Sequence, residues 1–175
     1  MKKSKVFGIG LFKTGTTSLG DALKILGYNH VNLWSRYTNV YDYKNQTELL
    51  NKLSDEYDSF EDYPWMYCYK EMSEKYKDAK FILTLRKEEL YRKSEIKVRL
   101  REGWTMEESI RDVEENIIPR YYKHLEDVRN YFNGSKNYLE VDFSKGDGWI
   151  QICNFLEEKI PDIDFPHSNK NTMKL

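Results

Sequence analysis

Apolar residues in this chain recur in two patterns, short continuous runs and the three-to-four-residue spacing of a helix. The runs predict buried strands at residues 6–10, 80–85 and 138–142, with a further strand candidate at 30–34. The helical spacing predicts helices at residues 16–26, 47–57, 65–76, 88–101, 106–132 and 149–158. Pro64 begins the third of these helices, and Pro119 predicts a kink in the fifth. Strands that alternate with helices predict an α/β fold with a central parallel sheet covered on both faces.

The chain is expected to form one domain. Its 175 residues contain no repeat, low-complexity stretch or linker, so we assign residues 1–175 to a single unit with a C-terminal tail over residues 160–175. Hydrophobic residues make up 39% of the chain, which is enough for a core. The 28 Lys and Arg residues nearly balance the 29 Asp and Glu residues, so net charge gives no reason to expect nucleic acid or an anionic membrane as a partner.

No segment has the pattern of a signal peptide or a membrane span, because the apolar run after the basic N-terminus is short and is interrupted by Lys13 and Thr14. We therefore expect a cytoplasmic protein. Cys68 and Cys153 stand far apart without a C-x-x-C pair, which predicts two reduced thiols. They supply too few ligands for zinc, and no metal site is predicted.

The turn between the first strand and the first helix has the composition of an anion-binding loop. It reads Gly10-Leu11-Phe12-Lys13-Thr14-Gly15-Thr16-Thr17-Ser18, with glycines spaced as in the Walker A pattern G-x-x-x-x-G. Glycines let the backbone approach an anion, and Thr16, Thr17 and Ser18 offer donors at the positive end of the helix. A tight turn with an N-cap would explain Gly15 and Thr16, but it leaves Lys13 unexplained.

Two features separate this loop from that of a nucleoside triphosphatase. Thr16 stands where the Walker pattern has Lys, and no acidic residue that would hold magnesium is evident at the end of a neighbouring strand. The strand at residues 80–85 ends instead in Arg86, a cation suited to a second phosphate group. The pattern favours metal-free chemistry on a phosphate-bearing donor, with a P-loop nucleotide or metabolite kinase as the rival interpretation.

These motifs resemble those of sulfotransferases that use 3'-phosphoadenosine 5'-phosphosulfate (PAPS). Residues 13–18 are similar to the family's 5'-phosphosulfate loop. Arg86 and Ser94 resemble the pair that holds the donor's 3'-phosphate group, and the segment that begins Lys145-Gly146 is similar to a C-terminal element of the family. The resemblance implies a three-layer fold of the P-loop type. It also implies metal-independent transfer of a sulfuryl group from PAPS to a hydroxyl or amine acceptor, with adenosine 3',5'-bisphosphate (PAP) as the product.

The resemblance also implies roles for single residues. Lys13 would neutralise the charge that grows on the bridging and leaving oxygens of the donor. The other residues expected to contact the donor are Thr14, Gly15, Thr16, Thr17, Ser18, Arg86, Ser94, Lys145 and Gly146.

The family's base lies before the helix that precedes the Arg-ending strand, where this chain reads Glu61-Asp62-Tyr63-Pro64. Aligned on the proline, Asp62 takes the position of the general base, with Glu61 in reserve. An Asp that caps the turn before a proline is the alternative. His30, His124 and His167 fit this role less well, and His124 has the setting of a packed or surface side chain in a helix.

One departure from the better-known cytosolic branch concerns adenine, because Ser18 stands where those proteins have Trp. Trp34, Trp104 and Trp149 are the candidates to replace it, and burial in the core is the alternative for each. Residues 101–132 are expected to form part of the acceptor wall or an oligomer contact. Sugar, lipid, phenol and peptide acceptors all stay open, as does the oligomeric state. A protein that binds PAPS without turnover is a second rival interpretation.

Overall fold

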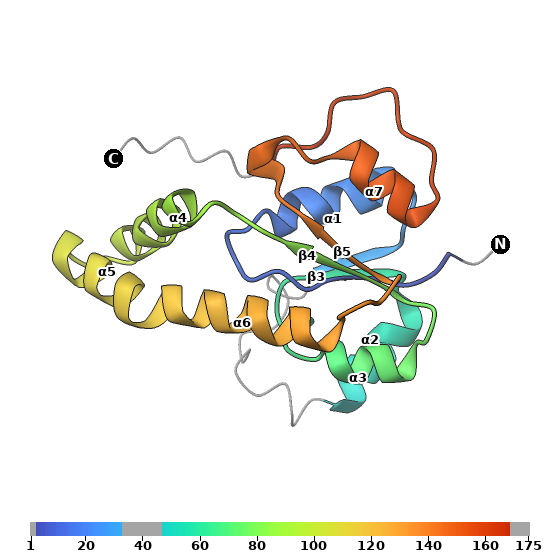
Figure 1. Ribbon diagram of the computed structural model, residues 1–175, viewed down its shortest axis with the longest axis horizontal. Helices are drawn as coiled ribbons and strands as arrows, with labels where there is room; N and C mark the ends of the chain where they lie inside the picture. The colour runs from blue at the N-terminus through green and yellow to red at the C-terminus, as the bar shows by residue number, and fades with distance from the viewer. Residues whose placement is uncertain (1–2, 33–46, 169–175) are drawn as a thin grey trace.

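The computed structural model describes residues 3–32 and 47–168 and confirms the α/β fold. Its five-stranded sheet has the order β2-β3-β1-β4-β5, and every strand pair is parallel (Figure 1). The strands are β1 (Val6–Gly8), β2 (His30–Asn32), β3 (Ser59–Glu61), β4 (Lys80–Thr84) and β5 (Tyr138–Val141). Because all pairs are parallel, the carboxyl ends of the strands meet at one edge of the sheet.

The helices match the predicted ones except in two places. They are α1 (Thr16–Ile25), α2 (Thr47–Glu56), α3 (Tyr69–Lys75), α4 (Glu88–Arg101), α5 (Met106–Asp112), α6 (Ile118–Tyr131) and α7 (Trp149–Leu156). The helix expected at 106–132 consists of α5, a π-helical turn (Val113–Ile117) and α6. The irregular turn falls just before Pro119, which has no amide to donate to that turn. Helix α3 begins at Tyr69, four residues later than the helix predicted from residue 65.

Strand β3 was not predicted, although it lies inside the sheet between β2 and β1. It has three residues, Ser59, Phe60 and Glu61, and only Phe60 is apolar. Neither alternation nor an apolar run can be recognised in so short a segment. All three residues are buried, and Ser59 pairs with Val6 of β1 and with His30 of β2. The strand therefore brings two acidic side chains, at its end and just after it, next to β1.

Two separate apolar cores cover the two faces of the sheet. On one face, Leu19 and Leu23 of α1 and Ile152 of α7 pack against the strands. On the other face, helices α2, α3 and α6 cover a core in which Phe60, Phe7 and Phe81 stack across three adjacent strands (Figure 1). The arrangement is the three-layer one that the pattern predicted. The burial of both faces leaves the carboxyl edge of the sheet as the place for ligands.

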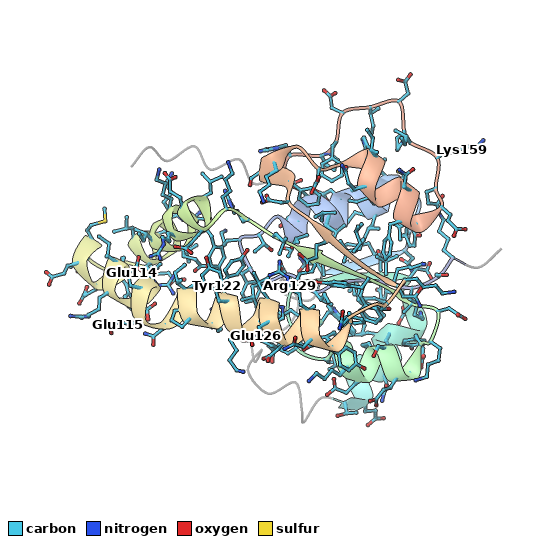
Figure 2. All side chains as sticks on the ribbon, viewed as in Figure 1. Glu114, Glu115, Tyr122, Glu126, Arg129 and Lys159 are labelled. Carbon is cyan, nitrogen blue, oxygen red and sulfur yellow. The ribbon has the colours of Figure 1, made fainter. Side chains whose placement is uncertain are left out.

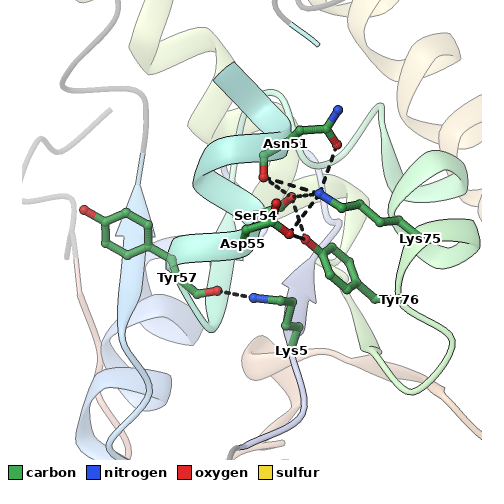
Figure 3. A network of polar contacts seen from close by, with 7 residues as sticks. All are labelled: Lys5, Asn51, Ser54, Asp55, Tyr57, Lys75 and Tyr76. Carbon is green, nitrogen blue, oxygen red and sulfur yellow. Dashed lines mark hydrogen bonds and ion pairs between the residues drawn. The ribbon is translucent and has the colours of Figure 1, made fainter. Parts of the chain in front are cut away.

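A polar network ties helices α2 and α3 to the start of β1 (Figure 3). Lys5 donates a hydrogen bond from Nζ to the carbonyl oxygen of Tyr57 at 2.7 Å. Between the helices, Tyr76 donates to Asp55 at 2.5 Å, and Lys75 forms an ion pair with Asp55 at 3.0 Å. These residues, together with Asn51 and Ser54, form what we call the amino-edge network, because Lys5 directly precedes β1.

The segment expected as a C-terminal tail packs on the domain as far as residue 168. The Phe165 ring lies 4.8 Å from that of Phe143 and 5.1 Å from that of Trp149. Ser168 donates through its amide to Ser18 Oγ at 3.1 Å and through its hydroxyl to Asp21 at 2.5 Å. Across residues 3–32 and 47–168, no helix is long and apolar enough to cross a membrane.

Candidate active site

Four segments meet at the carboxyl edge of the sheet. The loop at residues 10–15 follows β1, and Asp62 follows β3. Arg86 is the second residue after β4, and a 3-10 turn (Phe143–Lys145) follows β5. A Cβ atom added to Gly15 would lie 2.8 Å from the Phe143 ring, so the segment after β5 packs directly against the loop. The fold thus gathers at one edge most of the residues that the sequence indicated as candidates.

The loop after β1 is braced by β4. The Thr14 hydroxyl group donates to the Leu11 carbonyl oxygen at 2.6 Å and lies 2.6 Å from Thr84 Oγ1. Any side chain at Gly10 would clash with Thr84, which explains the glycine there. The hydroxyl group of Thr14 is thus occupied in holding the loop, and a contact between Thr14 and a donor stays a prediction.

The loop presents the start of α1 as an anion site. Gly15 precedes the helix with φ of 107°, and no described side chain caps the helix, whose first turn has no acidic residue. Its first amides and positive end therefore suit an anion. The hydroxyl group of Ser18 accepts a hydrogen bond from the Ser168 amide. The predicted contact between Ser18 and the donor would therefore be made by the Ser18 amide.

Lys13 lies at the loop with φ of 68°, a left-handed conformation that non-glycine residues seldom adopt. Burial lowers the pKa of its ammonium group, and the charges of Arg101 and Arg86 lower it further, whereas Glu95 and Asp62 act in the opposite direction. The charges of two arginines and of two acidic residues therefore act on Lys13. A half-buried cation of this kind on the loop favours an anionic ligand.

Arg86 connects this region to the end of β4. Its guanidinium group donates from Nη1 to the Lys13 carbonyl oxygen at 2.7 Å, and Tyr121 exchanges hydrogen bonds of 3.1 Å with its backbone. Ser94 is buried in α4. Arg101 ends the same helix seven residues after Ser94, and this spacing places both on one helix face. The basic composition of residues 86–101 is a second signal for Arg101.

Glu61 and Asp62 form a buried carboxyl pair beside the start of α1. Asp62 is 8% exposed with φ of 64°, and Glu61 is 1% exposed. Thr16 acts on the pKa of both carboxyl groups, and each carboxyl group acts on the pKa of the other. Burial and the negative charge of Glu61 raise the pKa of Asp62 to about 7, although the hydrogen bond from Thr16 and the charge of Lys13 act against this shift. A carboxyl group with such a pKa, close to a cation, suits general-base chemistry near neutral pH.

This pair corrects one sequence-based expectation. Acidic residues do stand at the end of a strand next to β1, because the unpredicted β3 pairs with β1 and ends in Glu61. The absence of such a carboxylate is therefore no argument against a kinase. The other argument holds, since Thr16 occupies the position of the Walker Lys.

The histidines agree with their expected minor roles. His124 Nε2 lies 2.7 Å from the carbonyl oxygen of Ile9 in the buried face of α6, so this residue packs in the core. His30 Nε2 lies 3.9 Å from Glu61 Oε1, and His167 lies in the segment that packs on α1. Lys145 is exposed, with Nζ 3.6 Å from Asp142 Oδ2, and Gly146 ends the turn with φ of 96°. A donor contact for Lys145 and Gly146 stays a prediction.

Of the three tryptophans proposed for adenine, Trp34 lies outside the described residues. Trp149 is 8% exposed and donates from Nε1 to the Ile163 carbonyl oxygen at 2.8 Å, so it holds the C-terminal segment. Trp104 is 43% exposed and lines a cavity of about 460 Å³ beyond the end of α4. The arm of α5 and α6 extends past the sheet with Glu114 and Glu115 exposed (Figure 2), and its role as acceptor wall or oligomer contact stays a prediction.

The fold and the site define an α/β protein whose first strand and first helix are joined by a loop suited to an anion. A family model described as a sulfotransferase domain matches residues 5–103 and 95–173, so the chain belongs to the sulfotransferase family. The crystal structure of a sulfotransferase from Alicyclobacillus acidocaldarius has the same fold, with a TM-score of 0.60 and 19% identity over 100% of this chain and 87% of that one. The comparison with curated proteins found no match.

Proposed function

We propose that this sulfotransferase takes the sulfuryl group from PAPS and transfers it to a hydroxyl or amine group of a small-molecule, lipid or glycan acceptor, without a metal ion. The observation that carries the proposal is that Lys13, on the loop after β1, and the buried Asp62, just after β3, both lie at the carboxyl edge of the sheet. A cation and a buried base with a pKa of about 7 there act on each other across the anion-binding loop. Such a pair supplies the two functions that in-line transfer requires, neutralisation of the leaving group and removal of a proton.

The loop and the start of α1 would hold the donor's 5'-phosphosulfate group. The amides of the first helical turn, the residues Thr16 and Thr17 and the positive end of the helix contribute there. Arg86 and Ser94 would hold the 3'-phosphate group, with Lys145 and Gly146 on the neighbouring segment. Because Arg86 also bonds to the Lys13 carbonyl oxygen, recognition of the nucleotide and the position of Lys13 are mechanically linked.

During transfer, Asp62 accepts the proton of the acceptor hydroxyl group as the acceptor oxygen forms a bond with sulfur. The bond between that sulfur and the bridging oxygen of the 5'-phosphate breaks, and PAP leaves with the electron pair. Lys13 stabilises the negative charge that develops on this oxygen. The proton stays on Asp62 until the products leave. Positioning and charge stabilisation thus account for the chemistry.

Calorimetric titration of the magnesium-free protein with PAP tests the donor site, with ADP and with ATP plus magnesium as controls. We expect tight binding of PAP without a metal and weak binding of ADP. Preference for ATP with magnesium would instead favour the kinase, for which the carboxyl pair at the end of β3 is the supporting observation. PAP binding without transfer to any acceptor in a screen with labelled PAPS would indicate a binding protein.

A further inference from the structure

Among the described residues, Asp62 and its neighbours contain buried polar atoms that have no hydrogen-bond partner. Within residues 3–32 and 47–168, Asp62 Oδ1, Glu61 Oε2 and His30 Nε2 are buried and have no hydrogen-bond partner. Most buried polar groups in proteins are paired, so three such atoms in adjoining side chains need an explanation. The other oxygen of Glu61 accepts a hydrogen bond from Asn32, and His30 Nε2 lies 3.9 Å from it. The hydrogen bonds of the cluster therefore do not fix which of these atoms carries a proton.

Helix α1 closes this cluster from above the sheet. A Cβ atom on Gly20 would lie 2.7 Å from His30 Nε2 and 3.2 Å from Glu61 Cγ, so the helix approaches both side chains closely. Only a glycine lets α1 pack here. The close packing keeps Glu61 at 1% exposure, and its carboxyl group faces Asp62 and Thr16 rather than solvent.

The charges around the pair do not neutralise two carboxylates. Lys13 on the loop acts on Asp62, and Lys24 of α1 acts on Glu61 from the exposed side of the helix. On β2, burial lowers the pKa of His30 to about 4, so this residue is neutral, and Asp21 of α1 adds a negative charge near it. Because two adjacent buried carboxyl groups with so little compensation resist ionising together, the second of them loses its proton only near neutral pH.

We propose that Glu61 is a positioning residue for the transfer reaction: its carboxyl group and that of Asp62 hold one proton between them, and this sharing keeps Asp62 a strong base with a fixed orientation. The inference rests on the proposed function for its catalytic meaning. Glu61 touches neither acceptor nor donor, and it acts through Asp62. Asn32 helps to fix the orientation of the pair, since it donates a hydrogen bond to one oxygen of Glu61.

The proton balance of the reaction follows from this arrangement. Before transfer the pair carries one proton and one negative charge, with Asp62 Oδ1 unpaired in the part of the chain that the structure describes. Asp62 takes the acceptor proton, and the pair becomes neutral while PAP gains the negative charge beside Lys13. After PAP and the sulfated product leave, one proton returns to water. The pair therefore buffers the charge in the site during a turnover.

The test is a titration of the two carboxyl groups by carbon-13 NMR in the wild type, Glu61→Gln and Asp62→Asn. Gln keeps the shape of Glu61 and can accept the hydrogen bond from Asn32. In Glu61→Gln, we expect the midpoint of Asp62 to fall by at least about one pH unit toward the ordinary carboxyl value. In Asp62→Asn, the midpoint of Glu61 should change as well, because the two carboxyl groups titrate together. Glu126→Gln, on an exposed position of α6 (Figure 2), should change neither.

Two results would overturn the proposal. One is an Asp62 midpoint that stays unchanged in Glu61→Gln, because the carboxyl groups would then titrate independently. The other is a joint shift of both resonances on addition of magnesium, which would make the pair a cation site. Calorimetric PAP binding in each variant shows whether the fold and donor site are intact. If PAP fails to bind even to the wild type, the proposed function is wrong, while the titration still decides whether the proton is shared.

Once an acceptor is found, the pH dependence of the transfer rate can be measured. A residue with a merely structural role would not change this dependence. In Glu61→Gln the acidic limb of the pH–rate profile should move to lower pH, and the maximal rate should fall by roughly threefold to tenfold, because a weaker base is a poorer catalyst. Glu61→Asp, which retains a carboxyl group, should restore part of both. A loss of rate with an unmoved acidic limb would contradict the assignment.

Discussion

The amino-edge network and the carboxyl-edge site are both polar clusters, but they treat charge in opposite ways. In the network, hydrogen bonds from Tyr76 and Lys75 lower the pKa of Asp55. Burial opposes the charge of Lys75, yet its bonds to Tyr76 and Asp55 raise its pKa. Both charged forms are thus favoured. At the site, burial lowers the pKa of Lys13 and raises that of Asp62, so both charged forms are disfavoured.

This difference distinguishes a polar cluster that stabilises the fold from one that is expected to act on a ligand. The network uses its charges on one another and contributes to holding α2 and α3 (Figure 3). The site leaves carboxyl oxygens unpaired and places Lys13 and Asp62 in left-handed backbone conformations. Strain and unsatisfied groups of this kind are costly and persist where a ligand uses them. Variants in the two regions should therefore change different measurable properties.

The largest effect is expected for Asp62→Asn. The variant cannot take the acceptor proton, and the transfer rate should fall roughly 1,000-fold, within the usual range for a general base. Since only ionised Asp62 accepts a proton, the wild-type rate should rise with pH up to about 7, and the residual rate of the variant should lack this rise. Transfer from labelled PAPS across pH measures both. A variant rate that keeps the same pH dependence would assign the base to another residue.

Lys13→Met should reduce the transfer rate by roughly 100-fold, because it removes stabilisation of a charge that develops during the reaction. PAP binding should weaken much less, since Arg86 and the helix amides remain. The matched control is Lys75→Met in the amino-edge network, which should leave both the rate and PAP binding unchanged. If Lys13→Met weakened PAP binding as much as it slowed transfer, Lys13 would serve binding rather than catalysis.

Arg86→Ala should weaken PAP binding by roughly 10- to 100-fold, as expected for the loss of a charged hydrogen bond. Adenosine 5'-phosphate, which lacks the 3'-phosphate group, should lose far less affinity. Because Arg86 also bonds to the Lys13 carbonyl oxygen, the loss for adenosine 5'-phosphate measures the part that comes from a disturbed loop. Calorimetry with both ligands separates the two contributions. Equal losses would refute the assignment of the 3'-phosphate.

Sequence patterns predicted the parts of the fold that have a strong local signal. The apolar run of β4 and the helical spacing of α1, α2 and α4 each identify their elements within one or two residues. Strand β3 escaped because two of its three residues are polar. Its burial comes from the neighbouring strands and from α1, which no local pattern records. The sequence predicted a kink at Pro119 but not its form. The missing amide of a proline can produce either a simple kink or a π turn, so the sequence does not distinguish the two.

The candidate site also has features with a local sequence signal and features that depend on packing. The loop at residues 10–15 could be indicated because its chemistry lies within one short segment. Asp62 was indicated by the family resemblance, aligned on Pro64. The contacts that set the properties of Lys13 and Asp62 come from distant segments. Arg101 and Glu95 act from α4, while His30 and Asn32 reach Glu61 from β2. Burial and charge at the site depend on packing, so they required the structure.

The smallest effect is expected for Tyr76→Phe in the amino-edge network. The hydroxyl group of Tyr76 bonds to Asp55 and lies 2.9 Å from Ser54 Oγ, and its loss should reduce the free energy of unfolding by about 1 kcal/mol. Chemical denaturation measures this change, and the transfer rate and PAP binding should stay at wild-type values. A change in either would mean that the two edges of the sheet are coupled. The division between a structural and a functional polar cluster would then fail.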